Sequence, residues 1–128
     1  MSVSSAAATV VVVEDDVALL QALRFMLLSE GFEALGCESA AELCALELPD
    51  TRLCLIIDER LPDGSGAAAL AALRARGVEA PAIVVTTAPD AALRAAVDAA
   101  GAHLVEKPLV GDALLAQVKA LLGDGDAG

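Results

Sequence analysis

Aromatic and basic side chains are scarce in this chain, and both shortages exclude classes of function. There is no Trp or Tyr, and Phe25 and Phe32 are the only aromatic residues, so stacking platforms for single-stranded nucleic acid are missing. Eight Lys and Arg stand against nineteen Asp and Glu, which gives a net charge of −11. This charge would repel a phosphate backbone. We therefore expect no direct nucleic-acid binding, whereas a metal cation or a basic partner surface would suit the charge.

Metal-binding cysteine patterns and long apolar runs are missing as well. The three cysteines, Cys37, Cys44 and Cys54, are spaced by 7 and 10 residues and match no zinc pattern. Their odd number leaves no complete set of pairs, which is typical of a reducing compartment. No positively charged leader opens the chain, and no apolar stretch approaches the roughly 18 to 20 residues of a membrane span. We expect a cytoplasmic protein without membrane contact.

The chain is rich in Ala, Val and Leu instead. Hydrophobic residues make up 57% of its 128 residues and charged residues 21%, a composition that suits one globular domain with a sizeable core. We expect a flexible lead-in over residues 1–8, a single domain over 9–122 and a disordered tail over 123–128.

Strand-like runs and helical patterns alternate along this domain. The pattern predicts strands over residues 9–13, 32–37, 53–58, 82–86 and 103–106, and helices over 17–30, 40–48, 66–76, 91–100 and 112–122. Ser39, with Glu42 as a capping box, and Asp90 are candidate N-caps, and Arg74, Arg76 and Arg94 are expected on solvated helix faces. Five strand and helix units in strict alternation predict a doubly wound α/β fold, with a five-stranded parallel sheet and helices on both faces.

Charged and hydroxyl side chains follow four of these strands at their carboxyl ends. They are Glu14 with Asp15, Asp58, Thr86 with Thr87, and Lys107. Ligands bind at this edge of open α/β sheets. Three carboxylates on adjacent strands would repel one another, and a hard cation such as Mg²⁺ would relieve the repulsion. A carboxylate beside Mg²⁺ with an amine nearby could attack a phosphoryl donor.

Each of these residues also has a simpler interpretation. Glu14, Asp15 and Asp16 could merely cap the following helix, and Asp58 could form a turn before a Pro-containing loop. Thr86 is also an ordinary strand residue, and Lys107 could form a surface ion pair of little value. The joint occurrence of the acids and the lysine favours the metal site.

Four motifs in order resemble the receiver domain of two-component response regulators. VVVVEDD is similar to that family's first strand and acidic pair, IIDERLPDGSG to its phosphoacceptor strand and loop, IVVTT to its switch strand, and EKP to its Lys-Pro pair. The resemblance spans about residues 10–122, and the 43 residues from Asp15 to Asp58 fix the register. Within the family, the motifs are most similar to the nitrogen-fixation regulator type. The resemblance implies the flavodoxin-like strand order 2-1-3-4-5 and a cis Lys107–Pro108 bond.

The resemblance also implies a role for each site residue. Asp58 matches the phosphoacceptor, Asp15 the direct Mg²⁺ ligand, and Glu14 the acid that acts on the ion through water. In the family, the residue at the position of Arg60 coordinates the metal through its backbone carbonyl. Thr86 matches the hydroxyl that moves towards the phosphoryl group, and Lys107 the amine that pairs with it.

Three positions depart from the family's pattern. Leu104 stands where the family usually places Tyr or Phe, so an aromatic switch is absent. The interval from Gly101 to Lys107 is one residue shorter than usual, which leaves the register of His103 open. Thr87 occupies a position where the family prefers a very small residue, and we expect it to slow access to the site or dephosphorylation.

Three functions from different classes follow. The first is a signalling phosphoacceptor that takes a phosphoryl group from a histidine kinase or histidine phosphotransfer protein, with at most self-catalysed phosphotransfer and autodephosphorylation. The second is a phosphorylation-independent interaction module, which Leu104 favours. The third is a Mg²⁺-dependent phosphohydrolase of the haloacid type, which would want an acid where Arg60 stands. Because the chain ends shortly after its last predicted helix, we expect a stand-alone receiver, monomeric or weakly dimeric, that acts by protein contact as a shuttle, a phosphate sink or a regulator of its kinase.

Overall fold

The computed structural model describes residues 8–49, 52–109 and 112–123. Most of the expected lead-in and tail, residues 1–7 and 124–128, therefore lies outside the described residues. Ala8, which we expected in the lead-in, is buried, and its carbonyl accepts a hydrogen bond from the Glu33 amide at 2.9 Å. Ala8 therefore packs against the sheet, and the expected domain bounds stay predictions.

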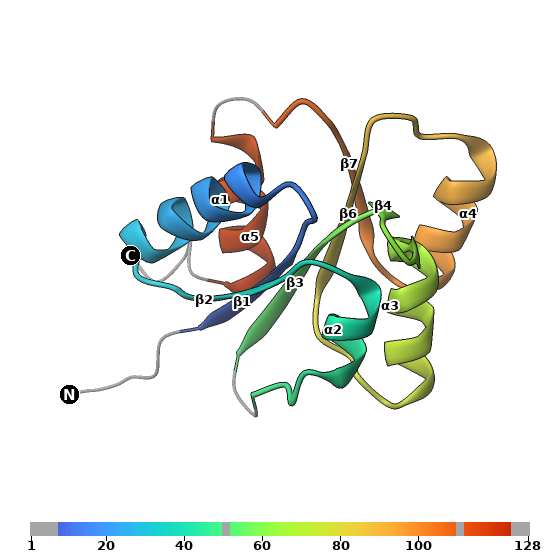
Figure 1. The fold of residues 1–128 in the computed structure, drawn as a ribbon, viewed down its shortest axis with the longest axis horizontal. Helices are drawn as coiled ribbons and strands as arrows, with labels where there is room; N and C mark the ends of the chain where they lie inside the picture. Colours follow the sequence, from blue (N-terminus) through green and yellow to red (C-terminus); the bar gives the residue numbers. More distant parts are fainter. Residues whose placement is uncertain (1–7, 50–51, 110–111, 124–128) are drawn as a thin grey trace.

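Five parallel strands form the central sheet. They are β1 (Thr9–Val13), β2 (Glu33–Cys37), β3 (Leu53–Asp58), β6 (Ala82–Thr86) and β7 (His103–Glu106). Their spatial order is β2-β1-β3-β6-β7 (Figure 1), which confirms the predicted fold class and order. Parallel neighbours need long crossover connections, and the intervening helices supply them.

Five helices cover the two faces of the sheet. They are α1 (Val17–Ser29), α2 (Ala40–Ala45), α3 (Gly66–Ala75), α4 (Ala91–Ala99) and α5 (Ala113–Leu122). Figure 1 shows α1 and α5 on one face and the other three helices opposite. The prediction for α2 was too long, because the chain turns to an extended conformation at Leu46 (ψ 134°). None of the helices that the structure describes is both long enough and apolar enough to cross a bilayer.

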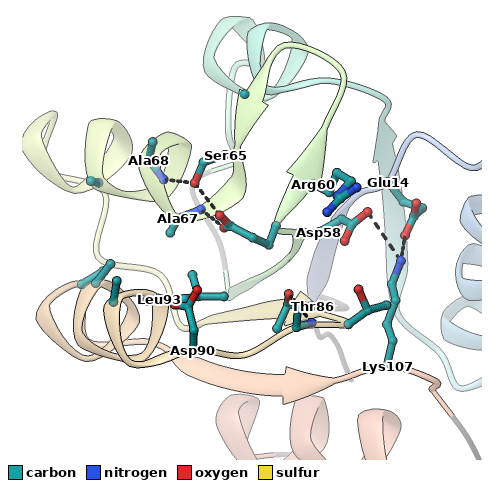
Figure 2. Close-up of a pocket in the computed structure, with 18 of the residues that line it drawn as sticks. Glu14, Asp58, Arg60, Ser65, Ala67, Ala68, Thr86, Asp90, Leu93 and Lys107 are labelled. Carbon is teal, nitrogen blue, oxygen red and sulfur yellow. Dashed lines mark hydrogen bonds and ion pairs between the residues drawn. The ribbon is translucent and has the colours of Figure 1, made fainter.

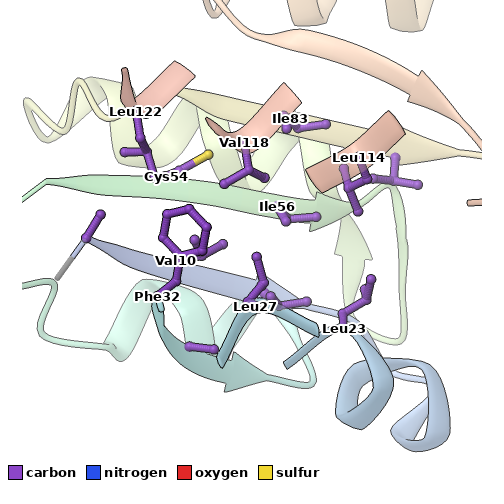
Figure 3. Packing of buried hydrophobic residues seen from close by; sticks show 14 of the residues in the cluster. Val10, Leu23, Leu27, Phe32, Cys54, Ile56, Ile83, Leu114, Val118 and Leu122 are labelled. Carbon is purple, nitrogen blue, oxygen red and sulfur yellow. The ribbon is translucent and has the colours of Figure 1, made fainter. Parts of the chain in front are cut away.

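The strands carry apolar side chains on both faces, which explains their uninterrupted hydrophobic runs. In β1, Val10 and Val12 pack with α1 and α5, as Figure 3 shows for Val10, whereas Val11 and Val13 pack with α2, α3 and α4. All four are at most 1% exposed. Burial of each valine stabilises the fold by about 1.5–3 kcal/mol relative to an exposed side chain, so the sheet is fixed from both sides.

Helix starts follow the predicted caps closely. The Ser39 hydroxyl accepts a hydrogen bond from the Glu42 amide, and Asp90 accepts one from Leu93. The capping-box glutamate differs in detail, because Glu42 reaches the Glu38 amide instead of the Ser39 amide. Side-chain acceptors at these positions satisfy amides that have no partner inside the helix.

Two arginines expected on solvated faces donate hydrogen bonds to the backbone of other elements. The Arg74 guanidinium donates to the carbonyls of Val78, Ala80 and Ala100, at 3.1, 2.7 and 2.8 Å. These carbonyls lie in the turn before β6 and at the end of α4, where intrahelical donors run out. Arg76 likewise donates to the Cys44 carbonyl of α2. The expectation was wrong for Arg74, which is half-buried, whereas Arg76 is exposed as expected. Helix periodicity cannot show which distant carbonyls lack a donor.

A short hairpin follows β3 where the sequence indicated only a loop. Its strands are β4 (Arg60–Leu61) and β5 (Gly64–Ser65), paired antiparallel with Arg60 opposite Ser65. Gly64 has a φ of +149°, a conformation that side chains disfavour. The hairpin returns the chain to the start of α3, beside the end of β3.

Candidate functional site

The carboxyl edge of the sheet gathers side chains from four strands. Val13 of β1 lies beside Ile57 of β3 in the parallel register, so Glu14, which follows β1, and Asp58, the last residue of β3, lie side by side at this edge. Thr86 ends β6, and Lys107 follows β7 directly. Figure 2 shows Glu14, Asp58, Thr86 and Lys107 converging on one pocket.

Three carboxylates form the acidic part of this pocket. One oxygen each of Glu14, Asp15 and Asp58 lies within 4.8 Å of the other two. Glu14 and Asp58 are only 4% and 7% exposed, whereas Asp15 faces solvent. Carboxylate oxygens are the ligands that Mg²⁺ prefers, and a partly exposed site leaves room for the waters it keeps. The three acids that the sequence singled out are therefore together, in an arrangement that fits a divalent cation.

Lys107 lies against the same acids. Its Nζ is 3.2 Å from Glu14 Oε1 and 3.5 Å from Asp58 Oδ2 (Figure 2). The side chain is only 20% exposed, so the surface ion pair considered above does not apply. The Lys107 amide donates to the Thr86 carbonyl at 2.7 Å, and the Lys107–Pro108 bond is cis, as predicted.

Burial and charge shift the ionisation of two of these groups. Burial raises the pKa of Glu14 despite the hydrogen bonds from the Asp16 amide and Lys107, and the charge of Asp58 raises it further. Burial alone would lower the pKa of Lys107, but its hydrogen bond to Glu14 and the negative charge of Asp58 outweigh that effect and raise the pKa above its ordinary value. The amine is therefore a positive charge at neutral pH, next to two buried acids.

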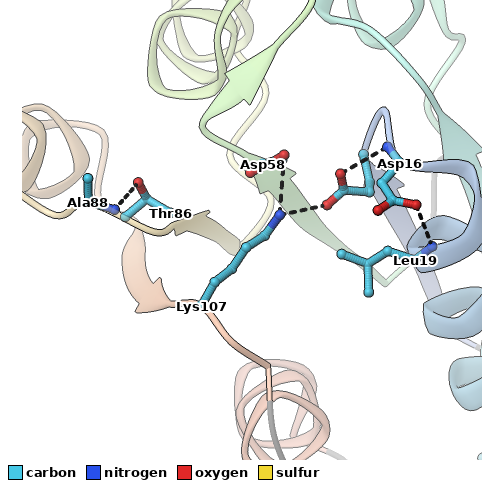
Figure 4. Close-up of polar contacts among 7 residues, drawn as sticks. Asp16, Leu19, Asp58, Thr86, Ala88 and Lys107 are labelled. Atoms are coloured by element: carbon cyan, nitrogen blue, oxygen red, sulfur yellow. Dashed lines mark hydrogen bonds and ion pairs between the residues drawn. The ribbon is translucent and has the colours of Figure 1, made fainter.

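Asp16, the third acid after β1, lies outside the group formed by Glu14, Asp15 and Asp58. Asp16 caps α1, with Oδ1 accepting from the Leu19 amide at 3.2 Å (Figure 4), and its own amide donates to Glu14 Oε2. The helix-cap interpretation thus holds for Asp16 alone, while Glu14 and Asp15 belong to the acidic group.

Thr86 and Arg60 are at the pocket but are not engaged with the acids. The buried Thr86 hydroxyl accepts a hydrogen bond from the Ala88 amide at 3.1 Å, so it is turned towards its own loop. Arg60 is exposed and lines the pocket, as does Thr87. The expected roles of the Thr86 hydroxyl and the residue-60 carbonyl stay predictions.

The acidic pocket continues into a cleft between α3 and α4. The cleft has a volume of about 1220 Å³. At one end lie the acids and Lys107, and at the other lie alanines of both helices, including Ala68, Ala71 and Ala96. The small side chains keep this end open.

Sequence reasoning missed three residues that shape the site. Glu59 accepts hydrogen bonds from the Ala67 amide and the Ser65 hydroxyl, both at 2.8 Å. A Cβ at Gly66 would overlap the carbonyl oxygen of Asp58, so only glycine allows α3 to begin this close to the acceptor strand. The only signal in the sequence for this role of Gly66 was the Gly64-Ser65-Gly66 run.

The third missed residue is Asp63, in the turn of the hairpin. It accepts hydrogen bonds from the Ala40 and Ala41 amides, both at 2.9 Å, and these bonds lower its pKa. The hairpin is thereby attached to the start of α2. Twenty-three residues separate Asp63 from Ala40, so no local capping pattern could have revealed the contact.

The positions near β7 that depart from the family's pattern do not disturb the carboxyl edge of the sheet. His103 lies opposite Ile83 and Glu106 opposite Thr86, which settles the register that the shortened interval had left open. Leu104 lies opposite Val84 and packs, half-buried, against the core on the side of α4. An aliphatic side chain thus fills the position where the resemblance expects an aromatic ring.

Comparisons with known proteins agree with this geometry. The family model of the response regulator receiver domain matches residues 10–119. Transcriptional regulatory protein FixJ of Azorhizobium caulinodans is 36% identical over 113 residues, which are 88% of this chain and 54% of that protein. Nodulation protein W of Bradyrhizobium diazoefficiens is 35% identical over 83 residues, 65% of this chain and 37% of that protein. The chain spans about half the length, or less, of these curated relatives.

A solved structure gives the same result for the fold. The CheY-like response regulator receiver domain protein of Methanospirillum hungatei is similar with a TM-score of 0.85 at 25% identity, covering 95% of this chain and 98% of that one. The similarity therefore extends over the whole domain.

Proposed function

This chain belongs to the response regulator receiver domain family, and we propose from that membership that it accepts a phosphoryl group on Asp58. The donor is the phosphohistidine of a histidine kinase or histidine phosphotransfer protein, and the cofactor is Mg²⁺. The observation that carries the proposal is the surroundings of Asp58, which is 7% exposed, grouped with Glu14 and Asp15, and 3.5 Å from the Lys107 amine.

The hydrogen bonds favour Asp58 over Glu14 as the nucleophile. Both oxygens of Glu14 are engaged, one with Lys107 and one with the Asp16 amide. Asp58 uses Oδ2 towards Lys107, and no hydrogen bond from the described residues reaches its Oδ1. A carboxylate oxygen that accepts no hydrogen bond is the better nucleophile, which supports Asp58 over Glu14 as the acceptor.

The transfer needs little chemistry from the protein beyond position and charge. An Asp58 oxygen bonds to phosphorus as the bond from phosphorus to the donor's imidazole nitrogen breaks. The bonding pair stays on that nitrogen, and a donor ring protonated on its other nitrogen leaves as neutral imidazole. Lys107 places a positive charge beside the phosphoryl oxygens. Glu14, Asp15 and Asp58, with the residue-60 carbonyl, would hold Mg²⁺, which when bound neutralises charge on the equatorial oxygens.

A small phosphodonor tests the proposal without a partner protein. The chain is incubated with acetyl phosphate and Mg²⁺, and intact mass spectrometry counts the added phosphoryl groups. We expect one group on the wild type and none on Asp58→Asn. Asp90→Asn is the matched control, because it removes a carboxylate from the same cleft and should still be modified. No addition to the wild type, or equal addition to Asp58→Asn, would overturn the proposal.

Leu104 favours a second candidate. If the aliphatic residue leaves the surface of α4 and β7 unchanged by phosphorylation, the domain serves as a phosphorylation-independent interaction module. Partner binding would then be the same for wild type and Asp58→Asn. A phosphohydrolase ranks last, because the exposed Arg60 stands where a second acid is needed.

The remaining features of the protein are proposals as well. We take residues 9–122 as the receiver domain, acting in the cytoplasm through protein contact and not through nucleic acid, as its net charge of −11 favours. The curated relatives extend well beyond the matched region, so the stand-alone arrangement and the monomeric or weakly dimeric state stay predictions. Phosphotransfer profiling against the histidine kinases of the source organism would identify the partner.

A further inference from the structure

The carboxylate of Glu59 fixes the loop that follows the proposed phosphoacceptor. Oε1 accepts from the Ala67 amide and Oε2 from the Ser65 hydroxyl, both at 2.8 Å. The main chain of Glu59 is held too, because its amide donates to Val85 and its carbonyl accepts from Gly66, again at 2.8 Å. One residue therefore joins the end of β3 to β6 and to the first turn of α3.

Arg60 follows this anchor directly and is the first residue of the hairpin. It is paired with Ser65 across β4 and β5, and the Ser65 hydroxyl is in turn bonded to Glu59. On the other side, Gly66 packs directly against the carbonyl of Asp58. A movement of the first turn of α3 would therefore displace the backbone of residues 58–60.

The negative charge of Glu59 interacts with the N-terminus of α3 and not with the acidic group of Glu14, Asp15 and Asp58. Its carboxylate accepts a charge-assisted bond at the N-terminus of α3, where the helix dipole favours an anion. The Gly66, Ala67 and Ala68 amides all have acceptors within residues 59–65. Glu59 is not among the three acids that could hold a cation, so its contribution to a metal site would be indirect.

We propose that Glu59 is a positioning residue for the metal site, holding the residue-60 carbonyl in place through its bonds to Ser65 and Ala67. This rests on the proposed function, in which that carbonyl is a Mg²⁺ ligand. A loop that is ordered beforehand need not be ordered when the cation binds, which raises affinity. Loss of such a supporting group typically weakens metal binding by about tenfold or more.

Two substitutions separate positioning from charge. In Glu59→Gln, the amide oxygen can still accept from Ala67 and the amide nitrogen can donate to Ser65, so the bonds remain and the charge is lost. In Glu59→Ala, both the bonds and the charge are lost. We expect Mg²⁺ affinity, measured by calorimetric titration without phosphodonor, to fall about tenfold in Glu59→Ala and to stay within about twofold of wild type in Glu59→Gln.

Asp90→Ala is the matched control. It removes a carboxylate that lines the same cleft and that caps α4 by accepting from Leu93 at 2.8 Å, but it leaves residues 59–65 untouched. We expect wild-type Mg²⁺ affinity. Ser65→Ala breaks the bond to Glu59 Oε2 from the other partner and should weaken Mg²⁺ binding severalfold, which keeps the test available if Glu59→Ala fails to fold.

The outcomes distinguish this inference from the proposed function. Unchanged Mg²⁺ affinity in Glu59→Ala or Ser65→Ala would overturn the positioning role. Equal weakening of Mg²⁺ binding in Glu59→Gln and Glu59→Ala would also overturn it. So would a loss of affinity in Asp90→Ala as large as that in Glu59→Ala. At saturating Mg²⁺, Glu59→Ala should be phosphorylated by acetyl phosphate at nearly the wild-type rate. A wild type that binds no Mg²⁺ and takes no phosphoryl group would instead contradict the proposed function itself.

Discussion

The ammonium of Lys107 lies closer to Glu14, at 3.2 Å, than to Asp58, at 3.5 Å. The amine is thus held at the site by an acid other than the proposed phosphoacceptor. Glu14 leaves β1 and Lys107 follows β7, two strands separated by β3 and β6, so this contact connects distant parts of the sheet edge.

Replacement of Lys107 should destabilise the protein more than replacement of another cation at the cleft. Lys107→Met leaves the carboxylates of Glu14 and Asp58 buried without their counter-ion. Because the lysine is partly exposed, we expect a loss of about 1–2 kcal/mol in the free energy of unfolding. Urea unfolding in the presence of a chelator measures it. Arg60→Met, at an exposed residue of the same cleft, should stay within about 0.5 kcal/mol, and equal losses would contradict the prediction.

Magnesium should stabilise the folded domain through the acidic group. At a Mg²⁺ concentration of about ten times its dissociation constant, mass action adds about 1.4 kcal/mol to the free energy of unfolding. Asp15→Asn removes one of the three carboxylates and should abolish most of this gain at the same concentration. Thermal unfolding with and without chelator checks the effect. The idea fails if Asp15→Asn is stabilised as much as the wild type.

The Arg74 contacts predict a structural role outside the site. Arg74→Ala leaves the carbonyls of Val78, Ala80 and Ala100 without their donor, and we expect a loss of about 2 kcal/mol in urea unfolding. Arg94 is exposed on α4, and Arg94→Ala should change stability by less than about 0.5 kcal/mol. A loss for Arg74→Ala no larger than that for Arg94→Ala would show that water replaces the guanidinium.

Asp63 should make part of the stability depend on pH in the acid range. The Ala40 and Ala41 amides lower the pKa of the folded carboxyl below its ordinary value. Its contribution is therefore fully present above the pKa of the unfolded chain, about 3.9, and is lost as the pH falls through the lower folded value. The difference in melting temperature between wild type and Asp63→Ala should be constant from pH 7 to about pH 5 and shrink below pH 4. A difference that is the same at pH 3 and pH 7 would contradict the assignment.

Local patterns in the sequence were enough for most of the fold. The β-branched run of β1 and the apolar run of β3 predicted strands buried on both faces, and the Ser39 and Asp90 caps located two helix starts. The edge residues Glu14, Asp15, Asp58 and Lys107 could be grouped because parallel strands end at a common edge. Each of these inferences uses residues that are near one another in the chain, or a rule that holds for every parallel sheet.

Contacts between distant segments could not be predicted in the same way. The hairpin of residues 60–65, the early end of α2, and the Arg74 bonds all depend on which backbone groups meet in space. The same holds for Asp63, which caps a helix that precedes it by more than twenty residues.

The sequence by itself therefore determined which groups reach the site, because strand periodicity and strand ends decide where each side chain leaves the sheet. Only the tertiary structure decided how those groups are held: Lys107 by Glu14, the Asp58 carbonyl against Gly66, and the loop after it by Glu59. Hydrogen bonds depend on distances of a few ångströms between segments, and the order of residues along the chain does not specify such distances.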